Sequence, residues 1–121
     1  MQYAFPKHNK LCGRLAIDNL YATGKRFVAW PLRVTWKPAE ETKVLVWAPK
    51  SLFKHAVDRN HLRRLMREAY RLNQGILANP QSSIPNPHFL IAFNYMDKEQ
   101  KSFAEIEKAM RKALKKIADA R

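Results

Sequence analysis

Four arginines recur at regular intervals in the middle of the chain, and a fifth stands next to one of them. Arg59, Arg63, Arg67 and Arg71 are four residues apart, and Arg64 lies beside them. Residues four apart share one face of a helix, so this spacing predicts a ladder of like charge that weakens an isolated helix. The planar guanidinium of arginine bonds one phosphate through two donors and stacks on nucleobases. The pattern therefore favours a surface that binds nucleic acid over a face that is merely solvated.

Other polar and basic residues extend this surface. Asn60 and His61 stand among the arginines, where they can add hydrogen bonds to bases or to water. The connector before the segment contributes Lys50 and Lys54. We therefore expect RNA contacts from Lys50, Lys54, Arg59, Asn60, His61, Arg63, Arg64, Arg67 and Arg71, with Arg59, Asn60, Arg63, Arg64 and Arg67 foremost.

A long helix must present these side chains. Apolar residues follow the three-and-four spacing of a buried helix face from about Val57 to Leu77. They are Leu62, Leu65, Met66, Ala69, Leu72 and Ile76. Asp58 is expected to cap the helix N-terminus. The proline-rich segment 79–87 must end it.

The flanking segments predict the other elements. A helix is expected over Leu11–Thr23, with Gly24 at its C-terminal end. Strand-forming residues fill Lys25–Lys37, where Pro31 predicts two short strands or a bulge near a sheet edge. The apolar run Lys43–Ala48 predicts a strand covered on both faces.

A further strand, His88–Asn94, precedes a last helix. Ser102 and Glu105 have the spacing of a capping box at the start of that helix. We expect one α+β domain over residues 1–121, in which residues 1–10 form an irregular arm and helices pack against one small sheet.

Composition limits the partners. The chain has 23 Lys and Arg against 10 Asp and Glu, a formal net charge of +13. A polyanion is the natural partner for such charge. No apolar run approaches the about 20 residues of a membrane span, and the N-terminus lacks a signal core. We expect no membrane association and a cytoplasmic location. The single Cys12 excludes an intrachain disulfide and a cysteine zinc site.

No metal site of the protein's own is expected. Asp18, Asp58, Asp97 and Asp119 are scattered along the chain instead of forming a cluster. Aromatic residues are plentiful, and some of them can stack on unpaired bases. For any single aromatic residue, packing in the core is the simpler interpretation.

Residues 56–68 resemble the signature of the bacterial ribonuclease P protein subunit. The family pattern is Ala-Val-x-Arg-Asn-Arg-x-Lys-Arg-x-x-Arg-Glu, and this chain reads Ala-Val-Asp-Arg-Asn-His-Leu-Arg-Arg-Leu-Met-Arg-Glu. His61 replaces an arginine, which makes one phosphate contact depend on protonation, and Arg63 replaces a lysine. The segment Gly13-Arg14-Leu15, followed by Gly24, is similar to the family's opening helix.

The resemblance implies a two-layer α/β sandwich in the order α-β-β-β-α-β-α. The arginine helix would lie in a left-handed crossover. The partners would be a catalytic RNA subunit, which removes the 5′ leader of precursor tRNA, and the leader itself, held in a cleft between sheet and helix. No protein partner would be required, no protein residue would be catalytic, and Mg²⁺ would be bound mainly by the RNA. Tyr21, Phe27 and Trp30 are similar to the family's leader-facing aromatics; Ile17 departs from that pattern.

Two alternatives stay open. A structural RNA-binding protein of ribosomal type would share the charge and the fold class. A metal-free nuclease would need an acid and a base, for which His8, His55, His61 and His88 are the candidates.

Overall fold

The computed structural model describes residues 14–39, 41–77 and 88–119. Their elements follow in the order α1 (Arg14–Thr23), β1 (Lys25–Ala29), β2 (Leu32–Pro38), β3 (Lys43–Trp47), α2 (Ala56–Asn73), the 3-10 helix η2 (Gln74–Leu77), β4 (Phe89–Tyr95) and α3 (Phe103–Asp119). This order confirms the α+β prediction. The expected arm 1–10, the first three residues of the expected opening helix and the proline-rich segment lie outside the described residues.

One four-stranded sheet organises the molecule, in the order β1-β2-β4-β3. β1 and β2 form an antiparallel hairpin around Pro31, and β2 is antiparallel to β4. β3 runs parallel to β4 and forms the other edge. The predicted break at Pro31 is thus the turn of a hairpin.

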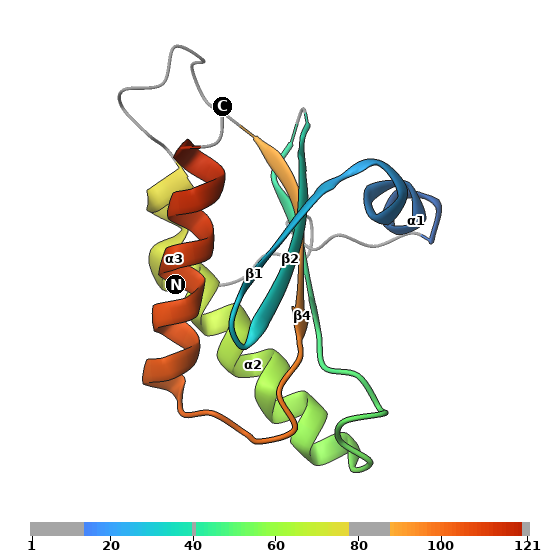
Figure 1. Ribbon diagram of the computed structural model, residues 1–121, viewed down its shortest axis with the longest axis vertical. Coiled ribbons are helices and arrows are strands. Elements are labelled where there is room, and N and C mark those ends of the chain that lie inside the picture. The colour runs from blue at the N-terminus through green and yellow to red at the C-terminus, as the bar shows by residue number, and fades with distance from the viewer. Residues whose placement is uncertain (1–13, 40, 78–87, 120–121) are drawn as a thin grey trace.

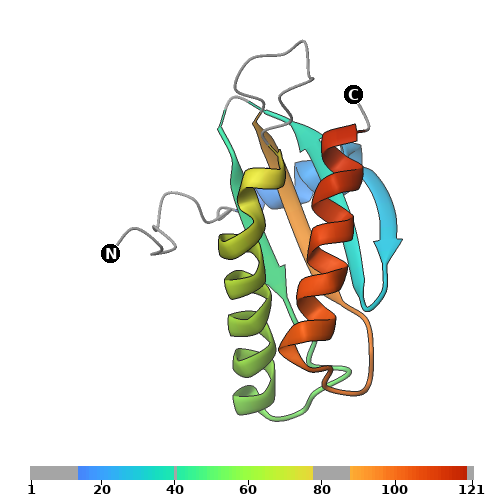
Figure 2. The same ribbon diagram turned by 90° about the vertical axis from the view of Figure 1, so that its left-hand side faces the viewer.

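Helices cover both faces of the sheet unequally. α2 and α3 lie side by side over one face, and α1 lies over the other (Figure 1; Figure 2). Because strand side chains alternate between faces, odd-numbered positions of β4 point into the main core with α2 and α3, and even-numbered positions point to α1. The residues of β2 and β4 in the main core are Leu32, Val34, Trp36, Phe89, Ile91, Phe93 and Tyr95. Leu20 of α1 packs on Ala92 in a smaller cluster on the opposite face.

The connection from β3 to β4 is a left-handed crossover. In Figure 2, β3 descends behind the helices, α2 rises in front of the sheet, and β4 descends to the right of β3. About 98% of parallel strand crossovers have the opposite hand. The family resemblance predicted this hand, and the crossover contains the arginine helix as expected.

Three local expectations were wrong in part. α2 begins at Ala56 after the N-cap His55, so Asp58 lies inside the first turn and is not the cap. Leu72 was expected on the buried face of α2, but it is 49% exposed. Tyr70 is buried on that face instead. β3 is an edge strand, so Trp47 is left 46% exposed.

The start of α3 agrees with its sequence signal. The helix begins at Phe103, directly after Ser102. The Ser102 hydroxyl accepts a hydrogen bond from the Glu105 backbone N–H at 3.3 Å, and it donates to the Glu105 carboxylate. This cap fixes where the second helix of the main layer begins.

Candidate nucleic-acid interface

The arginine surface lies on the outer side of α2. The inner side buries Leu62, Met66, Ala69 and Tyr70 against the sheet and α3. At about 100° per residue, Arg64 points almost directly away from this buried side, and it is exposed. The apolar face thus holds the helix down and orients the charged face outward.

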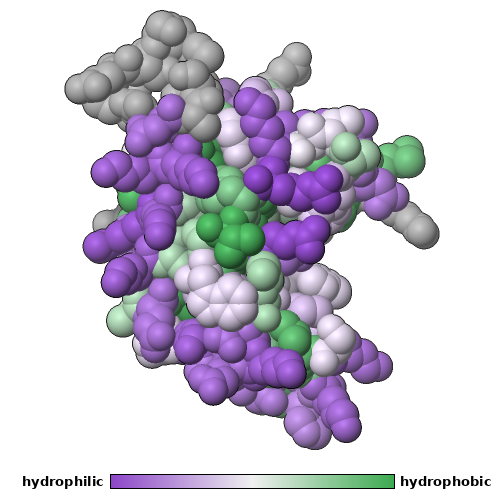
Figure 3. All heavy atoms as spheres, in the orientation of Figure 1, coloured by the Kyte–Doolittle hydropathy of each residue, from purple (hydrophilic) through white to green (hydrophobic). Residues whose placement is uncertain are grey.

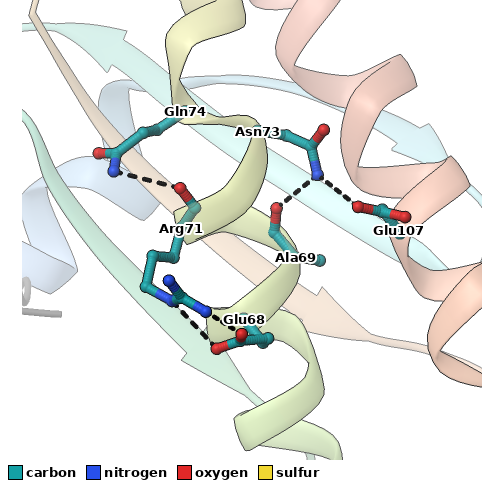
Figure 4. Close-up of polar contacts among 6 residues, drawn as sticks. All are labelled: Glu68, Ala69, Arg71, Asn73, Gln74 and Glu107. Atoms are coloured by element: carbon teal, nitrogen blue, oxygen red, sulfur yellow. Dashed lines mark hydrogen bonds and ion pairs between the residues drawn. The ribbon is translucent and has the colours of Figure 1, made fainter. Parts of the chain in front are cut away.

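Two of the predicted contacts are used inside the protein. Arg59 donates from one guanidinium nitrogen to the backbone oxygens of Phe53 and Lys54, each at 2.9 Å. Arg71 binds Glu68 through both its Nε and its terminal nitrogen (Figure 4). Arg59 therefore anchors the loop before α2, and the charge of Arg71 is compensated three residues away.

Arg63 joins α2 to the edge of the sheet. Its guanidinium lies 5.6 Å from the ring centre of Trp47 on β3, within the range of a cation–π contact. It also donates to the side-chain oxygen of Asn60. These contacts orient one arginine at the border between the helix and the sheet.

Arg67 lies in the densest part of the charge ladder. Partial burial lowers the pKa of its guanidinium, and the charges of Arg63 and Arg64 lower it further. Arginine stays protonated at ordinary pH, so its charge is partly desolvated and also repelled by its neighbours in the free protein. A bound phosphate would relieve that repulsion.

His61 does not lie on the same flank as Arg63 and Arg67. Two residues apart on a helix, side chains point about 160° away from each other, so His61 and Arg63 lie on opposite flanks with Asn60 and Arg64 between them. Lys50 and Lys54 are exposed in the loop before α2. The structure thus brings most predicted RNA contacts to one end of the molecule but spreads them around the helix.

The other end of α2 is tied to α3. Asn73 donates to the Ala69 backbone oxygen at 2.8 Å and to the Glu107 carboxylate at 3.1 Å (Figure 4). Arg111 of α3 donates to the Asn73 side-chain oxygen at 3.1 Å. These contacts fix the position of the arginine helix relative to its neighbour.

A second polar surface lies between α1 and the sheet. Tyr21 and Asn94 exchange hydrogen bonds at 3.0 and 3.3 Å. In the sheet register, Asn94 is flanked by Arg33 on β2 and Trp47 on β3, so these side chains share the α1 face. Lys37 on the same face donates to Asn19 of α1. Basic, amide and aromatic groups are therefore close together here.

The structure does not bring the three predicted leader-facing aromatics together. Tyr21 faces the sheet from α1, whereas Phe27 packs against the main core on the α3 side, beneath the ammonium group of Lys116 at 4.7 Å. Trp30 lines a groove with α3 residues. Phe27 occupies an odd position of β1, so its side chain points away from α1. A single cleft containing all three residues is therefore excluded.

Sequence reasoning missed Trp47 and Asn94 as parts of this surface. Trp47 was assigned to a strand covered on both sides, because nothing in Lys43–Ala48 shows that the strand lies at an edge. Its pairing with Asn94 depends on a crossover of about 40 residues, which local pattern does not reveal. The alternation of Asn94 with buried Phe93 and Tyr95 was the available signal.

Within residues 14–39, 41–77 and 88–119, no group of three or more His, Cys, Asp or Glu residues is placed to hold a metal ion. In the same part of the chain, no helix has the length and apolar character needed to cross a membrane.

The fold and surface define a small basic α+β protein with an arginine-rich helix in a left-handed crossover. Residues 5–118 match the sequence model of the Ribonuclease P family. The "Ribonuclease P protein component" of Porphyromonas gingivalis strain W83 is 37% identical over 121 residues, which cover 96% of this chain and 88% of that protein. The chain therefore belongs to the ribonuclease P protein family.

Solved structures agree on the fold. The RNase P protein from Thermotoga maritima superposes with a TM-score of 0.73 at 22% identity, covering 89% of this chain and 96% of that chain. A Staphylococcus aureus RNase P protein mutant, described as defective in mRNA degradation activity, gives a TM-score of 0.71 at 17% identity, covering 90% and 87%.

Proposed function

We propose that this chain binds the catalytic RNA of ribonuclease P and assists it in removing the 5′ leader of precursor tRNA. The observation that carries the proposal is the outward arginine face of α2, with Arg63, Arg64 and Arg67 on its surface. Membership of the family supports the identity of the RNA. Positive charge at this face lowers the repulsion between two RNA molecules that must approach each other.

The leader lies on the α1 side of the sheet. Tyr21 and Trp47 offer rings for stacking on unpaired bases, and Arg33 and Lys37 offer charge for the backbone. Phe27 and Trp30 take no part, because they belong to the opposite side. Arg63, next to Trp47, connects the leader surface to the RNA-binding helix.

The chemistry belongs to the RNA. Mg²⁺ ions, bound mainly by the RNA subunit, would supply the stabilisation of the attacking and leaving oxygens that phosphodiester cleavage needs. The side chains of this protein bind and orient the two RNAs. We further infer that the protein works in the cytoplasm and that it requires no protein partner.

Reconstitution tests the proposal. The protein alone should leave precursor tRNA intact, and adding it to the catalytic RNA should allow cleavage at lower Mg²⁺ than the RNA alone requires. Cleavage by the protein alone would favour the metal-free nuclease. If cell extracts yield ribosomal RNA bound to the protein and no catalytic RNA, the structural RNA-binding alternative replaces the proposal.

A variant pair tests the leader surface. Tyr21→Ala should weaken binding of leader-bearing precursor tRNA, with stacking on one ring worth about 1–3 kcal/mol, and should leave binding of leaderless tRNA unchanged. Tyr21→Phe keeps the ring and should retain most of the affinity. Equal losses for both tRNAs would place the leader elsewhere.

A further inference from the structure

A groove separate from the leader surface lies on the opposite side of the sheet. It has a volume of about 340 Å³ between the β1–β2 turn and α3. Its lining residues are Trp30, Pro31, Lys101, Glu105, Lys108, Ala109 and Lys112. Figure 3 shows pale and apolar side chains beside α3, over β1 and its turn, with hydrophilic side chains around them.

Trp30 forms an exposed but fixed wall of this groove. Its side chain is 58% exposed. The turn that holds it is anchored by the Met96 backbone N–H, which donates to the Pro31 oxygen at 2.8 Å. The Glu99 backbone N–H and Lys101 lower the pKa of the Asp97 carboxylate, and the indole, which lies near it, lowers that pKa to a smaller extent. A flat ring on an anchored turn, with more than half of its surface exposed, loses little freedom when it stacks on a base.

The lysines of the groove differ in whether a nearby acidic residue already compensates their charge. The Lys101 ammonium lies 3.3 Å from Asp97 and 3.7 Å from Glu99, so its charge is compensated. Lys108 and Lys112 are exposed and have no acidic partner among the described residues. They are four residues apart on α3, so they lie next to each other along the groove. Their charge is the part of the groove that can attract an anion.

We propose that this groove binds a segment of single-stranded RNA, with one base stacked on Trp30 and the neighbouring phosphates held by Lys108 and Lys112. An aromatic platform beside a basic track is the arrangement that binds unpaired nucleic acid without base specificity. An acidic peptide would use the two lysines but would leave the exposed ring of Trp30 unexplained. The sheet separates this site from Tyr21, so it holds a different stretch of RNA from the leader surface.

Tryptophan fluorescence can report on RNA binding in this groove alone. The chain has three tryptophans, and Trp36 is only 2% exposed. In a Trp47→Phe background, quenching by a ten-nucleotide oligouridylate therefore reports on Trp30. Saturable quenching is expected, and its loss in Trp47→Phe/Trp30→Phe would assign it to Trp30. Because the oligonucleotide is the only ligand, the result does not depend on leader binding or on cleavage.

A matched pair of double variants tests the lysines. Lys108→Ala/Lys112→Ala should weaken the quenching affinity about tenfold and reduce the slope of log affinity against log salt by about 1.4, since each contact to a single strand contributes about 0.7. Lys98→Ala/Lys115→Ala removes two exposed charges that do not line the groove and should change affinity less than twofold. Absence of Trp30 quenching, or equal losses in the two double variants, would overturn the proposal.

Discussion

Thr35 of β2 has a fully buried hydroxyl with no hydrogen-bond partner among the residues that the structure describes. A buried hydroxyl without a partner costs free energy, because it has given up its bonds to water. Thr35→Val keeps the shape and removes the polar atom, so the free energy of unfolding should rise by about 1 kcal/mol. Urea denaturation measures the change.

Thr42 provides the matched control. Its hydroxyl accepts a hydrogen bond from the Phe89 backbone N–H at 3.3 Å and contacts the His88 ring nitrogen at 3.3 Å. Thr42→Val should therefore lower the free energy of unfolding. Destabilisation of similar size in both variants would show that the Thr35 hydroxyl is satisfied in solution.

Tyr70 makes stability depend on pH in the alkaline range. Burial of this side chain raises the pKa of its phenol from 10.0 to about 12. The folded state then holds the phenol proton more tightly than the unfolded state does. The contribution of this group to the free energy of unfolding is therefore complete below pH 10, and it is lost as pH rises toward 12. Between pH 9 and pH 11, the free energy of unfolding should fall by about 1 kcal/mol from this group.

Tyr70→Phe isolates that contribution. The variant keeps the ring that packs 6.3 Å from Phe93 but has no proton to lose. Its stability should fall less steeply than that of the unaltered protein over the same pH range, as measured by urea denaturation at each pH. Parallel curves for the two proteins would mean that the Tyr70 phenol titrates normally.

Single residues also mark where sequence reasoning succeeded and failed at the site. Residue type and spacing predicted the arginine surface, because helical periodicity places residues four apart on one face. The use of Arg59 to hold the backbone of Phe53 and Lys54 was not predictable, since it depends on the path of a loop. The separation of Phe27 from Tyr21 depends on which face of the sheet each strand position points to.

At the scale of elements, the junction of α1 and β1 is tightly packed at Gly24. A Cβ added there would lie 2.6 Å from the Leu20 backbone oxygen and 3.0 Å from a side-chain carbon of Thr35. Backbone cannot move aside cheaply, so Gly24→Ala should destabilise the protein by about 1–3 kcal/mol. The loss should also misplace α1 and weaken leader binding.

Gly75 in η2 is the control for that substitution. A Cβ at this position meets nothing within 4 Å. Gly75→Ala should be neutral or should stabilise by up to about 1 kcal/mol through the unfolded state. Thermal unfolding of the two variants compares them directly, and equal melting temperatures would refute the packing argument at Gly24.

The order of the helices and strands was largely predictable from the sequence. Which strands pair with each other, and which strand lies at the sheet edge, was not. Hydrophobic periodicity and the proline and glycine positions predicted the helices and strands close to their observed bounds. The pairing of β3 with β4 instead of with β2, which leaves β3 at the edge, results from contacts distant in sequence. The hand of the crossover came from the family resemblance, since general rules favour the opposite hand.

The α2 helix should dominate the salt dependence of binding to the catalytic RNA. If about five phosphates are contacted, log affinity should fall with log salt at a slope near −4, taking about 0.7–0.9 per contact. Arg64→Ala should weaken binding and flatten this slope by about one unit. Arg71→Ala should flatten it less, because the Arg71 charge is already compensated by Glu68. Equal flattening in the two variants would show that Arg71 leaves Glu68 to bind RNA.

At the scale of the whole molecule, charge affects folding and binding in opposite directions. The formal net charge of +13 means that the free protein repels itself, and repulsion destabilises a compact state. Arg67 is a local instance: burial lowers the pKa of its guanidinium most, and the like charges of Arg63 and Arg64 lower it further. Bound RNA supplies the missing negative charge, so the complex should be considerably more stable than the free chain.

Sodium chloride should therefore have effects of opposite sign on the two properties. Raising its concentration from about 50 to 500 mM screens charges more than about 10 Å apart, so the melting temperature of the free protein should rise. Over the same range, affinity for the catalytic RNA should fall, because less is gained by releasing counterions. Thermal unfolding of the free protein and filter binding of the RNA measure the two trends. A melting temperature that falls with salt would mean that local ion pairs such as Arg71–Glu68 outweigh the net repulsion in stabilising the fold.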